Sequence, residues 1–576
     1  MAPLVVILFL VFSIAGITAA PAKESDLDWW QSCVVYQIYP RSFRDSDGDG
    51  VGDLKGITEK LDYLVDLGVC AVWMSPIYKS PMVDFGYDIS NYTEIDPIFG
   101  TMEDFEELRD RAHELGLKVI MDFVVSYTSD QMIWFQKSVR REDGYDDWYL
   151  WALGEKNESA PHGYNLPSNW LSAFRGSGWN WNEERQQFYF HTFTKEQPDL
   201  NYRDPGVVKA MKDVLRYWVD KGVDGFRVDA VPNMVEDINL HDELISGLVD
   251  DPDDYEYLTH IYTQHQPETY DMVQQWREVL DEYKGKDGHT RVMMTENYGP
   301  IDKVLQYYGT VERPGANFPF NFYLITNLDK NSRAHDFDRV IDMWLGNLQE
   351  NNWPDWLLGN HDQHRVASRY GVEMADALNM LSLLLPGTAI TYMGEELGME
   401  DTDVSWQDTV DPWGINAGEA NYKKYSRDPE RTPFQWDDTT NAGFSSSNKT
   451  WLPVNSNYKT VNVETEKQAT RSHYHVYKQL IELRKTRTIQ RGSTYTLALT
   501  DNVFAFTRVL DSSDPVVVVI NLGDVSETVN LSSLGSLPDA LNVYASSIHS
   551  DYRPGVIVDT RALGLHPKEA LVLTAS

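Results

Sequence analysis

Apolar residues recur at helical spacing before several short runs that are almost entirely apolar. The helix predicted over residues 57–67 ends at Gly68, and the run VCAVWMSP follows it directly. The same order of helix, glycine and apolar run is found at residues 105–125 and again at 207–231. Alternating helices and buried strands are typical of a parallel sheet covered by helices. This pattern alone fits both a closed (β/α)8 barrel and an open doubly wound sheet.

Two long segments interrupt the repeat. Residues 128–199 are rich in Trp, Asn, Gly and Ser and show little helical periodicity, and their aromatic content argues against disorder. We expect them to form a lid subdomain inserted into an α/β unit of residues 28–127 and 200–485. A second irregular stretch covers residues 400–450. Over residues 490–576, runs such as YTLALT, VFAFTRVL and PVVVVINL alternate with turn residues, which predicts an all-β C-terminal domain.

The charge balance excludes some partners. With 50 Lys and Arg against 88 Asp and Glu, the formal net charge is −38. Nucleic acid and anionic lipid surfaces are bound by basic residues, so we expect neither as a partner. A neutral ligand suits an acidic protein. The 18 Trp and 32 Tyr fit either a large core or stacking against sugar rings.

The N-terminus carries a targeting pattern. Residues 3–17 form one apolar run followed by small residues, which predicts a signal peptide over residues 1–20. The run is too short to span a bilayer comfortably and no second one follows, so we expect a secreted, extracellular protein without a membrane span. Four N-x-S/T triplets are compatible with that route and are candidate glycosylation sites: Asn91, Asn157, Asn448 and Asn530.

Cys33 and Cys70 are the chain's two cysteines, which excludes a cysteine-based zinc site. Each comes at the start of an apolar, strand-like run, CVVYQIYP and CAVWMSP. If these strands are neighbours in a parallel sheet, both sulfurs lie at the same end and are able to form a disulfide. The alternative is two buried free thiols. Secretion favours the disulfide.

Polar side chains stand where the predicted strands end. Asp122 ends VIMD, Asp229 ends FRVD, Glu296 ends VMMTE, and His361 with Asp362 ends WLLGNHD. In a barrel these ends converge on one face. Any one of these carboxylates is explained by a cap or an ion pair, but together they favour acid/base or nucleophilic chemistry. Two carboxylates about 5–5.5 Å apart are the equipment of a retaining glycosidase.

The strings DFGYD (84–88), GFRVDAV, TENY and GNHD resemble, in order and spacing, the signature regions of the α-amylase family of glycoside hydrolases. The similarity covers about residues 28–480. Insect-type maltases and α-glucosidases share stretches that resemble WWQSCVVYQIYPRSFRDSDGDGVGDLKGI and YSRDPERTPFQW. The resemblance implies a (β/α)8 TIM barrel with a domain inserted after the third strand and a C-terminal β-sandwich. It also implies an exo-acting, retaining α-glucosidase of the maltase or sucrase type that acts on small neutral α-glucosides without an organic cofactor.

Carried onto this sequence, the resemblance assigns roles to individual residues. Asp229 is expected to be the nucleophile, Glu296 the general acid and base, and Asp362 the group that holds the 2- and 3-hydroxyls. Arg227 is expected to keep the nucleophile ionised. Ala230, which follows the nucleophile, resembles the residue of α-1,4- and sucrose-active members. The resemblance further implies that the terminal glucose is bound by Asp88, Arg365, Tyr87 and His361.

The loop DSDGDGVGD resembles the structural calcium site of related enzymes. Its alternating carboxylates are hard oxygen ligands that suit Ca2+. It is not an EF-hand, because the twelfth position is Gly56. The alternative is a solvated acidic turn. The expected ligands are Asp45, Asp47, Asp49, Val51 and Asp53.

Two positions depart from the family pattern. Members commonly have Asn-His-Thr where this chain has Ser126, Tyr127 and Thr128, and the usual histidine contacts the 6-hydroxyl of glucose. Tyr127 is larger, so it either makes a different hydrogen bond or narrows the pocket. Asn233 replaces the His or Tyr often found near the leaving-group subsite. Altered specificity, transglucosylation and a catalytically weakened binding or receptor protein are all open, and the intact carboxylate trio favours the hydrolase. Which disaccharide is preferred and the oligomeric state are left open.

Overall fold

Eight parallel strands form the central sheet of the computed structural model, which describes residues 27–575. The signal peptide predicted over residues 1–20 lies outside the described residues. The strands run in the order β11-β10-β9-β5-β2-β1-β13-β12, and every neighbouring pair is parallel. Their bounds are β1 (Val34–Ile38), β2 (Ala71–Met74), β5 (Lys118–Val124), β9 (Gly225–Asp229), β10 (Val292–Thr295), β11 (Phe318–Pro319), β12 (Asp355–Leu357) and β13 (Thr388–Tyr392).

Side chains close the gap between β11 and β12, the two end strands of this order. The Asn321 backbone N–H donates to Asp355 Oδ2 at 3.0 Å, and the Asn321 side-chain amide donates to the Asp355 carbonyl at 3.3 Å. The sheet is thus a nearly closed barrel, which confirms the predicted (β/α)8 fold and rules out the open doubly wound sheet.

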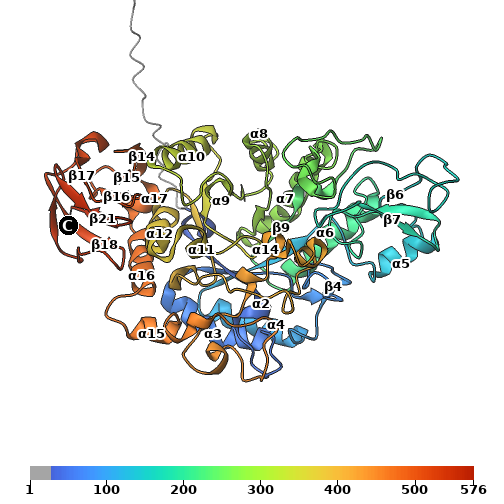
Figure 1. Cartoon of the computed structure of the whole chain (residues 1–576), viewed down its shortest axis with the longest axis horizontal. Coiled ribbons are helices and arrows are strands. Elements are labelled where there is room, and N and C mark those ends of the chain that lie inside the picture. The colour runs from blue at the N-terminus through green and yellow to red at the C-terminus, as the bar shows by residue number, and fades with distance from the viewer. Residues whose placement is uncertain (1–26, 576) are drawn as a thin grey trace, which may run out of the picture.

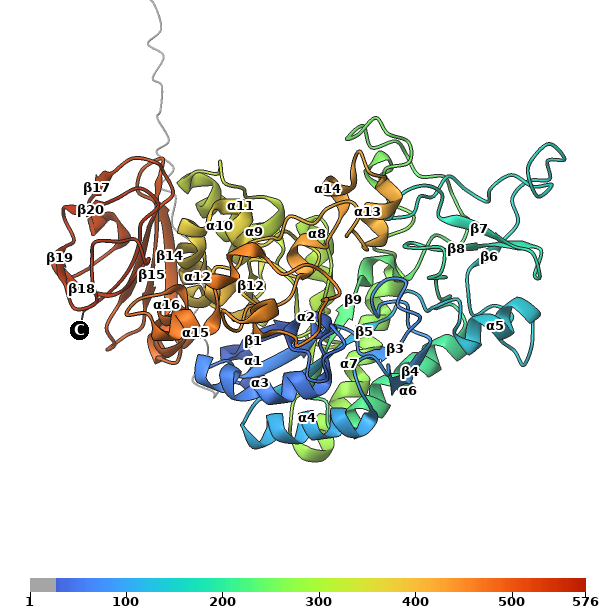
Figure 2. The same cartoon turned by 60° about the horizontal axis from the view of Figure 1, so that its bottom comes forward.

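Helices cover the outer face of the barrel (Figures 1 and 2), and most of them are amphipathic, although the helix of residues 375–384 is buried on all sides. The first of them confirms the helix end predicted at Gly68, which has φ 95° and donates its N–H to the Leu64 and Val65 carbonyls. Asp53 caps the other end by accepting the Gly56 N–H. The covering helices are α3 (Leu54–Leu67), α4 (Met102–Glu114), α6 (Pro205–Asp220), α7 (Pro267–Asp287), α10 (Ala334–Asn347), α12 (Ala375–Leu384) and α16 (His473–Arg484).

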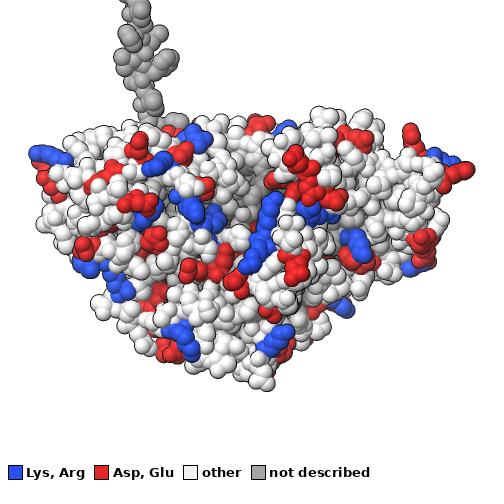
Figure 3. Space-filling model, in the orientation of Figure 1, with Lys and Arg blue, Asp and Glu red and all other residues white. Residues whose placement is uncertain are grey.

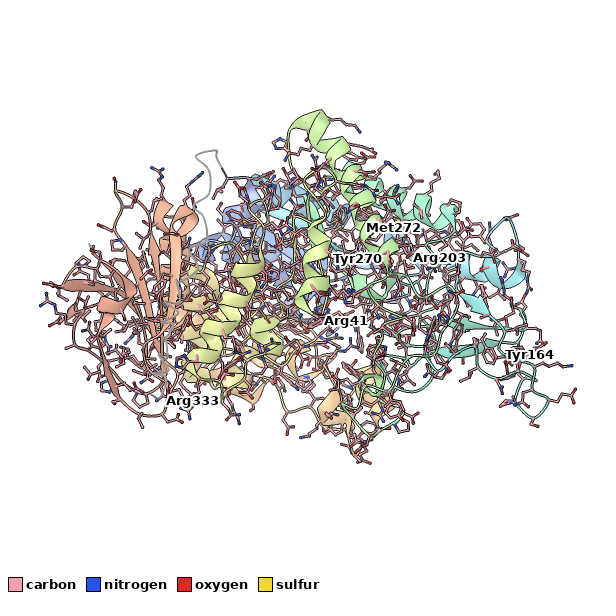
Figure 4. The ribbon with its side chains drawn as sticks, turned by 90° about the horizontal axis from the view of Figure 1, so that it is seen from above. Arg41, Tyr164, Arg203, Tyr270, Met272 and Arg333 are labelled. Carbon is pink, nitrogen blue, oxygen red and sulfur yellow. A yellow bond between two sulfur atoms is a disulfide. The ribbon has the colours of Figure 1, made fainter. Side chains whose placement is uncertain are left out.

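The segment between β5 and α6 forms a subdomain at one end of the long axis, opposite the C-terminal domain (Figure 2), and Tyr164 lies near its tip (Figure 4). It contains one helix that periodicity did not predict, α5 (Ile133–Arg140), which buries Phe135 and Val139. A three-stranded antiparallel sheet follows, with the order β6-β8-β7. Its strands are β6 (Trp151–Ala152), β7 (Trp179–Asn182) and β8 (Gln187–Phe190). A small core of Trp170, Trp179, Phe188 and Phe190 stabilises it.

Two antiparallel sheets form the C-terminal domain and pack around a shared apolar cluster, as the sequence predicted. Arg333, at the start of α10, lies beside this domain in Figure 4 and donates to the Asn502 side chain at 2.5 Å. The larger sheet has the order β14-β15-β16-β21-β18-β19 and the smaller one pairs β17 with β20. The strands are β14 (Ser493–Ala498), β15 (Val503–Val509), β16 (Val516–Asn521), β17 (Glu527–Val529), β18 (Ala540–Ser546), β19 (Ile557–Asp559), β20 (Leu563–Leu565) and β21 (Ala570–Thr574).

Short elements fill the connections. Among residues 27–575, no helix combines the length and apolar character that a bilayer crossing requires. The short strands β3 (Tyr78–Lys79) and β4 (Asn91–Ile95) pair with each other. The short helices are α1 (Trp29–Ser32), α2 (Pro40–Phe43), α8 (Ile301–Val304), α9 (Tyr323–Thr326), α11 (Val366–Tyr370), α13 (Pro412–Ala417), α14 (Tyr422–Tyr425), α15 (Val463–Gln468) and α17 (Arg487–Arg491).

A disulfide joins the amino ends of two neighbouring barrel strands. Cys33 precedes β1, Cys70 precedes β2, and their sulfurs are bonded with the Cα atoms 5.6 Å apart. On the surface, the acidic excess does not gather into one patch on the face shown in Figure 3, where acidic side chains lie among basic ones.

Candidate active site

One buried arginine links three carboxylates at the carboxyl ends of β5, β9 and β10. Arg227 Nη1 lies 2.8 Å from Asp229 Oδ1 and 3.0 Å from Asp122 Oδ2, and Nη2 lies 2.5 Å from Glu296 Oε2. The arginine is only 1% exposed. Burial raises the pKa of Asp122 to about 6, and Arg227 opposes this shift. Burial also raises the pKa of Asp229, with Arg227 again opposing it and the charge of Glu296 adding to it.

Ala230 connects the ends of β9 and β10. Its φ of 39° lies in the left-handed region, which is unusual for a residue with a side chain. In this conformation the Ala230 N–H donates to Glu296 Oε2 at 3.0 Å, and its carbonyl accepts from the Ser126 hydroxyl at 3.1 Å. Backbone strain of this kind gathers at functional sites. Here it aims a backbone donor at a carboxylate that follows the neighbouring strand.

Tyr87 and His361 form a stacked pair beside Asp122. Their rings are 5.3 Å apart and nearly parallel. The Tyr87 hydroxyl donates to Asp122 Oδ2 at 2.8 Å and also contacts His361 Nε2, while the Gln37 side chain lies 2.8 Å from His361 Nδ1. Burial lowers the pKa of His361 well below its ordinary value, so the imidazole is neutral. One face of Tyr87 is therefore covered by a neutral ring.

Asp362 is held as an anion by cationic neighbours. Its Oδ1 lies 2.6 Å from Arg431 Nη2 and 3.2 Å from Arg427 Nη1, and His361 Nε2 lies 3.3 Å from Oδ2. Burial acts to raise the pKa of Asp362, but the charges of Arg431, Arg427 and Arg227 hold it well below its usual range. Asp362 is therefore ionised. The pKa of Asp229 is shifted in the opposite direction, above its ordinary value.

These groups face a cavity of about 600 Å³. The inserted subdomain contributes Phe174 and Phe193 to its wall, and the segment of residues 400–450 contributes Trp413, Tyr425 and Arg427. Arg227 lies behind the carboxylates and does not line the cavity. The predicted residues that do line it are Tyr87, Tyr127, Asp229, Asn233, Glu296, His361 and Asp362.

Two residues expected to bind the sugar lie elsewhere. Asp88 accepts hydrogen bonds from the Ser80 hydroxyl and from the backbone N–H groups of Val83 and Asp84, so its carboxylate holds the turn of its own motif. Arg365 donates to the Met393 carbonyl at 2.7 Å, with its guanidinium over a neighbouring tyrosine ring. Neither side chain lines the cavity.

The cavity instead presents the buried pair Asp84 and Arg427, whose Oδ1 and Nη2 atoms are 2.8 Å apart. Arg427 also contacts Asp411 and Asp362. Neither residue is among those to which the family resemblance assigns a role. The available signal was their position in the motifs DFGYD and YSRDPERTPFQW, which carry Asp84 and Arg427 respectively.

The two positions that depart from the family pattern both reach the cavity. Tyr127 donates its hydroxyl proton to Asp229 Oδ2 at 3.0 Å, and its ring packs edge-on against Phe193. Asn233 donates to the Tyr255 hydroxyl at 3.2 Å. Tyr127 therefore forms a hydrogen bond with a carboxylate of the site and also forms part of the cavity wall.

Comparison with known proteins is consistent with this geometry. The family described as "Alpha amylase, catalytic domain" matches residues 37–492. The chain belongs to the α-amylase family. It is 51% identical to "Maltase 1" of Drosophila virilis, covering 96% of this chain and 87% of that protein, and 47% identical to "Salivary alpha-glucosidase" of Aedes aegypti, covering 98% and 97%. The solved structure of the "alpha-glucosyl transfer enzyme, XgtA" aligns with a TM-score of 0.84 at 33% identity, covering 96% of this chain and 100% of that one.

The acidic loop of this α-amylase-family chain brings part of the expected calcium set together. Carboxylate oxygens of Asp45, Asp47 and Asp49 lie within 4.8 Å of one another. Asp53 accepts from the Ser46 N–H at 2.7 Å and caps α3, and the Val51 N–H donates to Asp49 Oδ1 at 2.7 Å. The three converging carboxylates supply the hard oxygen donors that suit Ca2+.

The candidate glycosylation sites differ in exposure. Asn448 and Asn530 are exposed, whereas Asn91 and Asn157 are half-buried. Asn157 donates its side-chain amide to the Asn165 side chain at 2.8 Å, and Asn91 accepts from the Thr93 hydroxyl at 2.9 Å. Access to a glycosylating enzyme is therefore greatest at Asn448 and Asn530.

Proposed function

We propose that this protein is an exo-acting, retaining α-glucosidase that hydrolyses terminal non-reducing α-linked glucose from di- and oligosaccharides. The observation that carries the proposal is the joint placement of Asp229 and Glu296 on Arg227, at the wall of a cavity that also presents Asp362. Membership of the α-amylase family and the names of the relatives, maltase and α-glucosidase, support the same reaction.

In the first step, an Asp229 carboxylate oxygen attacks the anomeric carbon of the bound glucose. The glycosidic C–O bond breaks, and Glu296 gives its proton to the leaving oxygen, so that an aglycone with a free hydroxyl departs. Arg227 contacts both carboxylates and the Ala230 N–H holds Glu296 Oε2, so each reacting group is oriented before the sugar binds.

In the second step, water cleaves the glucosyl-enzyme ester. Glu296, now ionised, takes a proton from the water while the water oxygen bonds to the anomeric carbon and the bond to Asp229 breaks. Two displacements at one carbon return the original α configuration. The ionised Asp362 lies in the same wall, where its negative charge stabilises the positive charge that develops on the sugar ring in both transition states.

The polar end of the cavity supports cleavage at the non-reducing end of the sugar. The Asp84–Arg427 pair and Asp362 offer charged acceptors and donors close together, which suits the several hydroxyls of a terminal glucose. Aromatic wall residues Phe174, Phe193 and Trp413 suit the apolar faces of the ring and of the aglycone.

The deciding experiment measures glucose release from maltose, sucrose and isomaltose by the purified protein, with Asp229→Ala as the control. We expect turnover of maltose or sucrose, α-glucose as the first product observed by NMR, and loss of turnover in the variant. Folded wild-type protein that releases glucose from none of the three sugars would refute the proposal and favour a binding or receptor role on the same scaffold.

Transfer of the glucosyl group to a sugar is the second candidate reaction. The solved structure with a TM-score of 0.84 is named as an α-glucosyl transfer enzyme, although it is only 33% identical to this chain. Transfer uses the same glucosyl-enzyme and differs only in the acceptor. Product analysis at high maltose concentration separates the two, because transfer gives trisaccharides and hydrolysis gives glucose alone.

We also propose that Asp45, Asp47 and Asp49 bind a structural Ca2+, with Val51 and Asp53 completing the set. The support is the convergence of three carboxylates, since the ion would offset their mutual repulsion. The loop lies directly before α3, so the metal would stabilise the first turn of that helix. We expect a chelator to lower the melting temperature of the wild type and to have no effect on Asp45→Asn or Asp49→Asn.

We also propose that the protein is secreted and carries N-linked glycans. The apolar N-terminal run supports export, and the exposed Asn448 and Asn530 support glycan attachment. Expression of the full chain in insect cells should place glucosidase activity in the medium. A glycosidase that removes N-linked glycans should then reduce the apparent mass of the wild type more than that of a variant with Asn448→Gln and Asn530→Gln.

A further inference from the structure

Three side chains with metal-ligating atoms converge outside the sugar cavity. His364 lies before α11, Asp401 lies beyond β13, and Glu430 lies in the 3-10 helix η6 (Pro429–Arg431). His364 Nδ1 is 2.8 Å from Asp401 Oδ2 and 3.4 Å from Glu430 Oε2. One ligand atom from each of the three residues lies within 4.8 Å of the others.

The buried atoms of this cluster lack adequate hydrogen-bond partners. Glu430 is only 1% exposed, and its Oε2 has no well-aligned donor, since its nearest partner, His364 Nδ1, lies 3.4 Å away and is closer to Asp401. Asp401 is oriented toward the histidine because its other oxygen, Oδ1, accepts the Arg365 backbone N–H at 2.8 Å. A single ring N–H cannot align well with two carboxylates at once. A buried carboxylate oxygen without a donor is unfavourable unless a cation pairs with it.

We propose that His364, Asp401 and Glu430 bind a divalent transition-metal ion, with Zn2+ as the ion that their chemistry favours. One imidazole and two carboxylates form a mixed nitrogen and oxygen set, which suits Zn2+ better than Ca2+ or Mg2+. An adjoining cavity of about 260 Å³ is lined by His364 and Asp401 and has room for a water ligand at a fourth position.

The bound ion would join two segments that also carry residues of the sugar cavity. His364 stands two residues after Asp362, and Glu430 stands between Arg427 and Arg431, which contact that aspartate. A metal would therefore fix these segments to each other from the side away from the sugar. The alternative occupant is a proton, in which case a protonated imidazole pairs with the two carboxylates and no metal binds.

The test is titration of the purified full chain with Zn2+ by calorimetry, with Ca2+ in excess to saturate the acidic loop of residues 45–53. We expect one high-affinity equivalent in the wild type. His364→Ala should weaken Zn2+ binding at least about tenfold. Loss of a group that merely supports a metal ligand already weakens binding about tenfold, and loss of the ligand itself should weaken it no less. Its side chain is 44% exposed, so this variant should fold. Glu430→Gln tests the buried ligand with little change of shape.

Asp403→Asn is the matched control. Asp403 lines the same small cavity, but its carboxylate pairs with Lys423 at 2.7 Å and is not part of the cluster. This variant should bind Zn2+ as the wild type does. Wild-type protein that takes up no Zn2+, or equal affinities in the wild type and His364→Ala, would overturn the proposal and identify the cluster as an ion triad only. Because the readout is binding, its outcome is independent of whether the protein hydrolyses α-glucosides.

Discussion

The Tyr127 hydroxyl donates a hydrogen bond to Asp229 Oδ2 at a distance of 3.0 Å. Arg227 contacts the other oxygen, Oδ1, at 2.8 Å, so both oxygens of the proposed nucleophile have a donor. The tyrosine is 2% exposed and packs edge-on against Phe193, with ring centroids 5.0 Å apart. The inserted subdomain thus helps to position a side chain that touches the reacting carboxylate.

Tyr127→Phe should weaken catalysis most at low pH. A hydrogen bond to an ionised group contributes about 1.5–3 kcal/mol, and about 1.4 kcal/mol corresponds to one pKa unit. Removing a donor to the anion raises the pKa of Asp229, which must be ionised to attack. We therefore expect kcat/KM to fall about tenfold and the acid limb of its pH profile to move up by about one unit.

The wild type, measured over the same pH range and with the same substrate, is the control for that experiment. Identical pH profiles for the wild type and Tyr127→Phe would show that the hydrogen bond contributes nothing to the reacting enzyme.

The sequence pattern predicted the parallel sheet and its carboxylates for a simple physical reason, whereas the closed barrel was implied only by the family resemblance. Buried parallel strands are apolar, so a carboxylate at the end of one, such as Asp229 or Glu296, stands out. Arg427 gave no such signal, because it lies in an irregular segment nearly 200 residues beyond Asp229 and meets Asp84 only in the folded chain.

The choice between Asp84 and Asp88 depends on a turn that no periodicity reveals. Phe85 and Gly86 both have positive φ, at 49° and 110°. This turn brings the backbone N–H groups of Val83 and Asp84 onto the Asp88 carboxylate and leaves the Asp84 carboxylate facing the cavity. Two aspartates of one motif therefore take different tasks, and only the backbone geometry separates them.

Exchanging each aspartate for asparagine should separate binding from stability. Asp84→Asn removes the charge that pairs with Arg427 in the cavity, so we expect kcat/KM for maltose to fall at least about a hundredfold, or about 2.7 kcal/mol. Asp88→Asn weakens the turn instead, so the melting temperature should fall while kcat/KM stays within about threefold. Kinetics and thermal melts of both variants decide the matter. The reverse ranking would restore Asp88 as the sugar-binding residue.

Removing the disulfide should cost stability without affecting the chemistry. Cys33 and Cys70 are 37 residues apart in sequence, and a cross-link closing a loop of that size stabilises a protein by about 3–4 kcal/mol in the chain-entropy description. The bond lies at the amino ends of β1 and β2, and the cavity lies at the carboxyl ends of the strands.

The double variant Cys33→Ser and Cys70→Ser should unfold at a lower denaturant concentration yet keep its specific activity at 25 °C. Reduction of the wild type should lower the midpoint equally, and an unchanged midpoint in the variant would contradict the prediction.

Glu395 should make the protein less stable as the pH rises. It lies in the 3-10 helix η5 (Glu395–Leu397), is 3% exposed, and accepts one backbone N–H, from Tyr392 at 3.2 Å. Burial raises its pKa from 4.5 to about 8. Between these values the folded protein holds a proton that the unfolded chain has lost, so the free energy of unfolding falls as the pH rises through this window. The contribution is complete below pH 4.5 and lost above pH 8.

Glu395→Gln is neutral throughout, so its denaturation curves at pH 5, 6.5 and 8 should change less than those of the wild type. The exposed control Glu464→Gln should behave as the wild type does. Equal pH dependence in the wild type and Glu395→Gln would mean that the buried carboxyl is ionised in the folded protein.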